Sequence, residues 1–215
     1  MNQERRSYRQ FCGLARALDA VGERWTLLIV RNLLLGPQRY VDLQAGLPGI
    51  TTNLLARRLK DMQAAGLVER VHAPAPTPAR LYALTERGRA LEPAILALGG
   101  WGSADLSDGP RPDDILELDW AMVSLKRRYA PCEASRVRLQ VDDRSYGLLL
   151  GGPRLEVQRG GSADADLEVR TDTGSLRRLL FRGASLGQLE RDGYVETRGT
   201  RAHLRTFRRS LALTR

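Results

Sequence analysis

The stretch ITTNLLARRLKDMQAAGLVER, from Ile50 to Arg70, predicts an amphipathic helix that leads directly into a β-strand. Leu55, Leu59 and Met62 recur at the i, i+4, i+7 spacing, which places their side chains on one face of a helix. Such a helix would pack its apolar face on a core and turn a polar, basic face to solvent. The residues roughly opposite the apolar face are Asn53, Arg57 and Lys60.

Two residues mark the ends of this predicted helix. Thr51 is suited to the N-cap, because its hydroxyl can accept a hydrogen bond from one of the first backbone N–H groups. Gly66 follows the helix as a residue that readily adopts the left-handed conformation. A solvated surface helix would show the same pattern, so the neighbouring segments decide between that interpretation and a nucleic-acid-binding helix.

Two shorter helices are predicted upstream. The first is a core helix, because its apolar residues share one face, and it ends at the glycine and proline of positions 36 and 37. Its apolar stripe comprises Trp25, Leu28, Ile29 and Leu33. The second, Tyr40 to Ala45, carries Tyr40, Val41 and Leu43 and is followed by a Leu-Pro-Gly turn. The tight connection predicts a helix-turn-helix.

Downstream of the amphipathic helix the pattern predicts a β-hairpin. Residues 67–73 and 80–84 are rich in strand-forming side chains, and the proline-rich segment 74–78 joins them as a stiff tip. Three helices followed by such a hairpin, all within about one hundred residues, predict a winged helix-turn-helix domain that binds duplex DNA.

Three motifs in this half carry a family resemblance: ALDAVGERWTLLIVRNLLLGPQRYVDL, LPGITTNLLARRLKDMQAAGLVER and ARLYALTERGRALEPAILALGGWG. In order and spacing they resemble the HxlR-type winged helix-turn-helix regulators, over about Cys12 to Gly102. The resemblance implies a bacterial cytoplasmic transcription factor that binds double-stranded operator DNA as a homodimer. Tyr40 to Ala45 would be the supporting helix, Thr51 to Ala65 the recognition helix, and the proline-rich hairpin the wing.

On this interpretation six side chains are candidates for contact with DNA. Asn53 and Arg57 are suited to base edges, because an amide and a guanidinium make paired hydrogen bonds with adenine and guanine. The others are Thr51, Thr52 and Lys60, for phosphates or bases near the helix start, and Arg80, for a phosphate or the minor groove beside the wing. Arg58 lies nearer the core side, where we expect an intramolecular ion pair.

Composition agrees with a nucleic-acid partner but does not establish one. The chain holds 34 lysines and arginines against 25 aspartates and glutamates, a net charge of +9, and such an excess attracts polyanions of any kind. The excess is spread over both halves of the chain. All but two of the basic residues are arginines, a bias that a GC-rich genome would also produce.

Cysteine content and hydropathy limit the class of protein further. Cys12 and Cys132 are too few and too distant for a disulfide framework or a zinc site. No apolar run approaches the roughly 20 residues that span a bilayer, and the first residues lack a signal-peptide core, so we expect a cytoplasmic protein with no membrane partner. Some regulators of the resembled type carry a redox-sensing cysteine near position 12. Cys12 is therefore a candidate redox sensor, with a small buried residue as the alternative.

The chain is predicted to form two domains joined by a linker. Thr85 is suited to cap a helix in which Leu91, Ile95 and Leu98 follow at near-helical spacing up to residue 102, and the resemblance implies that part of this helix packs on a dimer mate. Residues 103–114 are poor in large apolar side chains and rich in proline, glycine and aspartate, which favours a linker. The predicted divisions are a winged helix-turn-helix domain over residues 1–102, a linker and connecting helix over 103–135, and a second domain over 136–215.

The second half predicts an α+β fold. One helix is expected from Ile115 to Tyr129, and strands are expected from Val137, Ser145, Arg154 and over 166–170 as an antiparallel meander. Helices over 172–181 and 185–191, a strand at 194–198 and a closing helix from 200 to about 211 complete the pattern.

The ending, from DADLEVRTDTGSLRRLLF to TRAHLRTFRRSL, is similar to the sterol carrier protein 2-like domain over about Arg136 to Ala212. This resemblance implies a mostly antiparallel sheet, covered by helices, around a cavity for a hydrophobic small-molecule effector. Large apolar side chains are usually buried for packing alone, so each candidate lining residue is also an ordinary core residue. The candidates are Trp120, Met122, Tyr146, Leu148, Leu179, Phe181 and Phe207. Ligand binding there would change the spacing or mobility of the two DNA-binding heads. Alternatively, the domain only widens the dimer interface.

An enzyme is not expected, because no catalytic constellation is present. His72 and His203 have no spacing that suits a metal site or a nucleophile–base pair. The paired aspartates at 113–114 and 142–143 fall in a linker and a turn, and no Walker-type or dinucleotide motif occurs, so we expect no metal and no cofactor. Two functions remain: a ligand-modulated DNA-binding regulator, and a carrier of hydrophobic molecules whose winged helix serves dimerisation or protein contact.

Overall fold

The computed structural model describes residues 7–73, 79–106, 109–161 and 164–213. The chain divides into two compact units, Met1–Ile95 and Leu96–Arg215. The division falls before the boundary at residue 102 that the sequence predicted. Among the described residues, no helix is long and apolar enough to cross a membrane.

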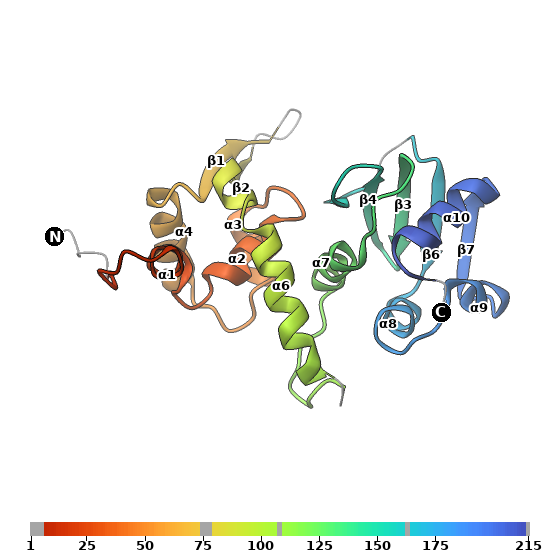
Figure 1. Cartoon of the computed structure of the whole chain (residues 1–215), viewed down its shortest axis with the longest axis horizontal. Helices are drawn as coiled ribbons and strands as arrows, with labels where there is room; N and C mark the ends of the chain where they lie inside the picture. Colours follow the sequence, from red (N-terminus) through yellow and green to blue (C-terminus); the bar gives the residue numbers. More distant parts are fainter. Residues whose placement is uncertain (1–6, 74–78, 107–108, 162–163, 214–215) are drawn as a thin grey trace. The chain divides into compact units, whose positions relative to one another are not determined.

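The first unit contains helices and one hairpin (Figure 1). Its elements are α1 (Gly13–Val21), α2 (Thr26–Leu33), α3 (Tyr40–Ala45), α4 (Thr52–Ala64), β1 (Val68–His72), β2 (Arg80–Leu84), α5 (Glu86–Arg89) and the first residues of α6 (Glu92–Gly102). The predicted order of helices and hairpin strands is confirmed. One difference is that the helix predicted after Thr85 is divided into α5 and α6. The tip 74–78, predicted as the stiff end of the wing, lies outside the described residues.

The core of the first unit is built from the apolar faces of α2, α3 and α4. Leu55, Leu59 and Met62 are buried, as the spacing predicted. Leu28 of α2, Val41 of α3 and Leu98 of α6 are instead exposed, although the sequence placed all three on apolar faces. Because α3 has only six residues, a single side chain, Leu43, fills its buried position. In α2, Val30 is buried together with Ile29 and Leu33, so the buried face includes Val30 in place of the predicted Leu28.

The wing is tied to the helical part by backbone contacts. β1 pairs with β2 antiparallel, with Val68 opposite Leu84 and His72 opposite Arg80. Gln38, in the loop between α2 and α3, adds a bridge to β2: its N–H donates to the Tyr82 carbonyl at 3.0 Å and its carbonyl accepts from the Tyr82 N–H at 2.8 Å. This bridge fixes the base of the wing relative to the loop that leads into α3.

Thr85 and Gly88 pack α5 tightly against the start of the wing. The Thr85 hydroxyl accepts from the Gly88 N–H at 3.0 Å and donates to the Gly66 carbonyl at 2.6 Å, which confirms the predicted cap. A Cβ on Gly88 would lie 2.1 Å from the Leu67 carbonyl oxygen. The close approach therefore requires glycine at this position.

The second unit is an α+β layer structure (Figure 1). After the end of α6 come η1 (Ser103–Leu106), α7 (Leu118–Arg128), β3 (Ser135–Val141), β4 (Arg144–Leu150), β5 (Glu156–Arg159), β6 (Leu167–Thr171), α8 (Thr173–Phe181), α9 (Leu186–Arg191), β7 (Val195–Gly199) and α10 (Arg201–Ser210). The four 3₁₀ residues of η1 occupy the start of the predicted linker. α7 begins three residues later than predicted, because a turn from Arg111 to Asp114 leaves Ile115 and Leu116 exposed before it.

The sheet topology corrects one prediction. The strand order is β5-β4-β3-β6-β7, and β3 pairs with β6 in parallel. The sequence predicted an antiparallel meander in which the fourth strand continues the hairpin series. The chain instead returns across the sheet, so that β6 lies next to the central strand β3. The other three pairings are antiparallel, so the sheet is mostly antiparallel as expected.

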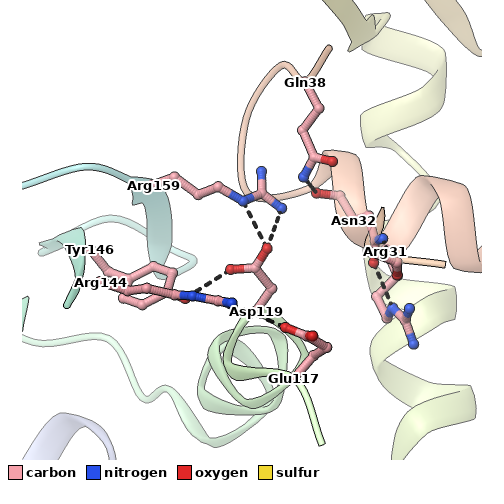
Figure 2. Close-up of polar contacts among 9 residues, drawn as sticks. Arg31, Asn32, Gln38, Glu117, Asp119, Arg144, Tyr146 and Arg159 are labelled. Carbon is pink, nitrogen blue, oxygen red and sulfur yellow. Dashed lines mark hydrogen bonds and ion pairs between the residues drawn. The ribbon is translucent and has the colours of Figure 1, made fainter. Parts of the chain in front are cut away.

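Helices cover one face of this sheet. Val137, Leu139 and Val141 of β3 are buried, whereas the alternate residues face the other side. Side chains from α7, α8, α9 and α10 meet the buried face. Polar contacts also hold α7 to the sheet: the Asp119 carboxylate accepts from the Tyr146 hydroxyl at 2.8 Å and from Arg159 Nε at 2.8 Å (Figure 2).

Candidate nucleic-acid interface

The N-terminal half of α4 is held by two side chains of α3. The Tyr40 hydroxyl donates to the Thr52 carbonyl at 2.6 Å, and Gln44 Nε2 donates to the Thr52 hydroxyl oxygen at 2.9 Å. Because the Thr52 oxygen accepts from Gln44, its own proton is directed to another acceptor. Tyr40 and Gln44 thus position the start of α4, a role that sequence reasoning did not assign. Their spacing, one turn apart on the predicted supporting helix, was the available signal.

The six predicted DNA-contact residues lie in two places. Thr51, Thr52, Asn53, Arg57 and Lys60 belong to α4 or its cap and are all exposed, and Arg80 is exposed on β2. The predicted cap is confirmed, since the Thr51 hydroxyl accepts from the Leu54 N–H at 3.4 Å. The capped N-terminus of α4 adds a partial positive charge beside Asn53. Arg57 and Lys60 are exposed further along the same helix, so α4 is suited to an anionic partner.

Arg58 makes the intramolecular ion pair that the sequence predicted. Its guanidinium donates to Glu23 at 2.8 Å and to Asp61 at 3.2 Å, and its side chain is only 11% exposed. Two adjacent arginines therefore have different surroundings. Arg57 is exposed, whereas Arg58 links α4 to the segment before α2.

A buried polar group connects α2 to the loops around α3 (Figure 2). Asn32 Nδ2 donates to the Gly46 carbonyl at 2.9 Å, and the Asn32 carbonyl accepts from Gln38 Nε2 at 3.2 Å. Arg31 Nε donates to Asn32 Oδ1 at 3.0 Å. Because buried amides are costly when unpaired, these bonds fix the turn between α3 and α4 and the loop that bridges to the wing.

The wing carries a basic face that the sequence analysis recognised only in part. Val68, Arg70 and His72 of β1 lie opposite Leu84, Tyr82 and Arg80 of β2. The Arg70 guanidinium stacks on the Tyr82 ring, 5.5 Å from its centroid, and donates to the Tyr82 hydroxyl at 3.3 Å. By the hairpin register, Arg70 shares this face with His72 and Arg80. Finding it from sequence required the hairpin register in addition to the strand pattern.

Cys12 is exposed at the N-cap position of α1, which removes the alternative of a small buried residue. Its side chain makes no cap hydrogen bond. Cys132 is partly buried. Within the described ranges no cluster of three or more histidine, cysteine, aspartate or glutamate side chains is arranged to hold a metal ion.

The sequence of this unit matches known regulators. The family model described as HxlR-like helix-turn-helix matches residues 20–109. The HTH-type transcriptional regulator YvaP of Bacillus subtilis is 38% identical over 89 residues, which is 41% of this chain and 82% of that protein. The chain belongs to the HxlR-like helix-turn-helix family. It is a transcriptional regulator of this DNA-binding type.

Other transcriptional regulators also match this chain. Rv3095 of Mycobacterium tuberculosis, also named as an HTH-type transcriptional regulator, is 42% identical over 100 residues, 46% of this chain and 61% of its own length. Among solved structures, the reduced form of the regulator YodB of B. subtilis is 30% identical, with a TM-score of 0.40, covering 47% of this chain and all of that one. The family match ends at residue 109, so most of the second unit lies outside it.

The predicted ligand site of the second unit is closed. Its interior contains a void of only about 10 Å³, lined by apolar side chains from α7 to α10 and the sheet. Of the seven predicted lining residues, only Leu179 and Phe207 border this void. Met122, Tyr146 and Leu148 are buried elsewhere in the core, Trp120 is partly exposed, and Phe181 is 51% exposed.

The Tyr146 side chain is held in place by a hydrogen bond to Asp119. Burial and the neighbouring Asp119 carboxylate raise the pKa of the Tyr146 phenol above its usual range. The phenol stays protonated and donates to Asp119, which locks the ring between α7 and β4. It is a fixed core group and does not border the void.

Proposed function

We propose that this protein is a sequence-specific regulator of transcription that binds double-stranded operator DNA as a homodimer in the cytoplasm. The observation that carries the proposal is the polar, exposed face of α4, whose start is fixed by Tyr40 and Gln44. A recognition helix must present its side chains in a defined orientation, because base readout depends on paired hydrogen bonds. α4 combines this orientation with a capped N-terminus and cationic side chains.

The residues of α4 would have different roles in the complex. Asn53 and Arg57 would contact base edges, and Thr52 would donate its hydroxyl proton to a phosphate oxygen, because its lone pair already accepts from Gln44. Thr51, at the helix start, and Lys60, further along α4, would contact phosphates. Arg80 on the wing would reach a phosphate or the minor groove.

A second copy of the chain would cover the exposed apolar side chains of α1. Leu14 and Leu18 of α1 are exposed, and Phe11, which precedes the N-cap of this helix, is fully exposed. In the second unit, Leu98 and Trp101 lie about one turn apart on α6 and are exposed as well. Clusters of large exposed apolar residues usually mark an interaction surface, and a two-fold pair presents two recognition helices to DNA.

The second unit would act as a sterol carrier protein 2-like domain that responds to a hydrophobic effector. A mostly antiparallel sheet with helices on one face and an apolar interior supports this assignment. A void of about 10 Å³ holds at most one water molecule, so an effector would bind only after the helices move apart. This need for movement disfavours the alternative function, a carrier that holds hydrophobic molecules in a permanently open cavity.

Competition binding tests the proposal. The full-length protein is titrated with a duplex from its own upstream intergenic region, with an unrelated duplex as competitor, over a salt series. We expect competitor-resistant binding that weakens steeply with salt, because several phosphate contacts release counterions. Arg57→Ala should lose the preference between duplexes, whereas Arg87→Ala, which removes an exposed arginine of α5, should keep it. Weak binding that is equal on both duplexes would refute the proposal.

A further inference from the structure

α10 carries a continuous row of exposed arginines. Arg201, Arg205 and Arg209 recur every fourth residue, so they lie on one face of the helix, and all three are exposed. We call these three residues the α10 arginine stripe. The opposite face of the helix is buried through Phe207 and Ser210. Because that face packs on the sheet, the stripe keeps a fixed orientation toward solvent.

The stripe is unfavourable for the helix that bears it. Arginines four residues apart repel each other, and the stripe contains two such pairs. Arg201 also lies in the first turn, where the helix dipole favours negative charge, and that turn contains no acidic residue. A surface helix selected for stability would place a glutamate at one of these positions. The arrangement therefore indicates a use for the charge outside the fold.

Nearby acidic groups do not neutralise the stripe. After Glu196 the sequence carries six arginines and neither aspartate nor glutamate up to its last residue. The nearest carboxylate of α9, Glu190, pairs with Arg208 on the flank of the helix. Within the described part of the chain, none of the three stripe guanidinium groups has an ion-pair partner. The stripe thus presents three positive charges that remain available to an external anion.

We propose that the α10 arginine stripe binds the sugar–phosphate backbone of duplex nucleic acid, independently of base sequence. At 1.5 Å per residue the three arginines span about 12 Å, a length of duplex that carries about seven phosphate charges. A guanidinium is suited to phosphate because it donates two parallel hydrogen bonds. No large apolar side chain is exposed on the described residues of α10, so the surface lacks the anchor that a lipid-binding helix inserts into a membrane.

This contact goes beyond the operator contact proposed for α4 and does not depend on it. A sequence-independent contact raises affinity for any duplex, and it keeps the chain on DNA while the first unit samples sites. Because both units belong to one chain, binding of one raises the effective concentration of the other at the same duplex. The stripe would strengthen occupancy without changing which sequence is preferred.

The test compares two triple variants of the full-length protein. Arg201→Gln, Arg205→Gln and Arg209→Gln together remove the stripe. The matched control changes three exposed arginines elsewhere in the second unit to glutamine, so that the net charge is identical. The control positions are Arg111, Arg170 and Arg182. The probes are a duplex of about 30 base pairs with arbitrary sequence, and vesicles of phosphatidylserine in phosphatidylcholine.

For each bound chain, the stripe variant should lower the slope of log affinity against log salt by about three, roughly one for each lost phosphate contact. Between 0.1 and 0.2 M salt, one bound wild-type chain should then lose about eightfold more affinity for the arbitrary duplex than one bound variant chain does. The control should keep the wild-type slope. Melting temperatures should be equal or higher in the stripe variant, because like-charge repulsion is removed, so weaker binding would not reflect unfolding.

Two results would overturn the inference. Equal slopes for the two triple variants would show that only net charge matters. Loss of vesicle binding in the stripe variant, with duplex binding unchanged, would assign the stripe to acidic lipid instead. Neither result bears on α4, because the preference for the upstream duplex and its loss in Arg57→Ala are measured separately.

Discussion

Substitution of Gly88 by alanine should destabilise the first unit, although alanine is normally favoured in helices. The added Cβ would lie 2.1 Å from the Leu67 carbonyl oxygen and 3.1 Å from a methyl carbon of Leu84. Ordinary van der Waals contact begins near 3.4 Å, so α5 or the start of β1 must move by more than 1 Å. Thr85 opposes this movement, because it is hydrogen-bonded to Gly66, Leu67 and Gly88.

The size of the effect follows from three contributions. Overpacking costs about 1–3 kcal/mol, and a weakened hydrogen bond at Thr85 adds about 1 kcal/mol. The higher helix propensity of alanine than of glycine offsets about 1 kcal/mol of this loss of stability. The free energy of unfolding should therefore fall by about 1–3 kcal/mol, because steric overlap outweighs propensity.

Urea unfolding of the full-length protein measures this change. Trp25 reports the first unit alone in a background in which Trp101 and Trp120 are replaced by phenylalanine. With a slope of about 1.5 kcal/mol per molar urea, the midpoint should fall by about 0.7–2 M. Gly13→Ala is the control, since a Cβ there meets nothing within 4 Å. If Gly88→Ala unfolds at the same urea concentration as Gly13→Ala, the close packing of α5 on the wing is wrong.

Three further predictions concern other residues. Arg58→Ala should lower the stability of the first unit by about 1–2 kcal/mol, through the lost ion pairs and stem packing, so an unchanged urea midpoint would contradict its structural role. Asp172 caps α8, and the hydrogen bond from Ser175 holds its pKa below the usual 3.8. The stabilisation from the ionised Asp172 carboxylate is present above that pH and is lost as the pH falls through the lowered pKa. Asp172→Asn should therefore make the free energy of unfolding, measured by circular dichroism, fall less steeply with pH below about pH 4. Cys12→Ser should leave DNA binding under reducing conditions unchanged and abolish any loss of binding on peroxide treatment; a variant as oxidant-sensitive as the wild type would remove Cys12 from redox sensing.

Local signals predicted most of the elements. The cap residues Thr51 and Thr85 were identifiable because a threonine before a helix satisfies a backbone N–H of its own first turn, which depends on only a few neighbouring residues. The burial of Leu55, Leu59 and Met62 followed from helical spacing alone. The Arg58 ion pair was predicted for the same reason, since its place near the core side is a property of the helix.

Non-local arrangements were not predictable in this way. The parallel pairing of β6 with β3 depends on where the chain returns to the sheet, and the period-2 alternation within a strand is the same whichever way its neighbour runs. The bridge between Gln38 and Tyr82 and the stacking of Arg70 on Tyr82 require the wing register. The closed interior of the second unit reflects how completely side chains from four helices fill it, which a list of large apolar residues does not reveal.

The most direct test of the central claim is a hydroxyl-radical footprint of the full-length protein on its own upstream intergenic duplex. Two recognition helices of a homodimer should protect two segments, related by two-fold symmetry and centred about 10 base pairs or a multiple of that distance apart. Arg57→Ala should remove both protected segments together. A single protected segment, or a uniform weak protection that Arg57→Ala leaves unchanged, would contradict sequence reading by α4.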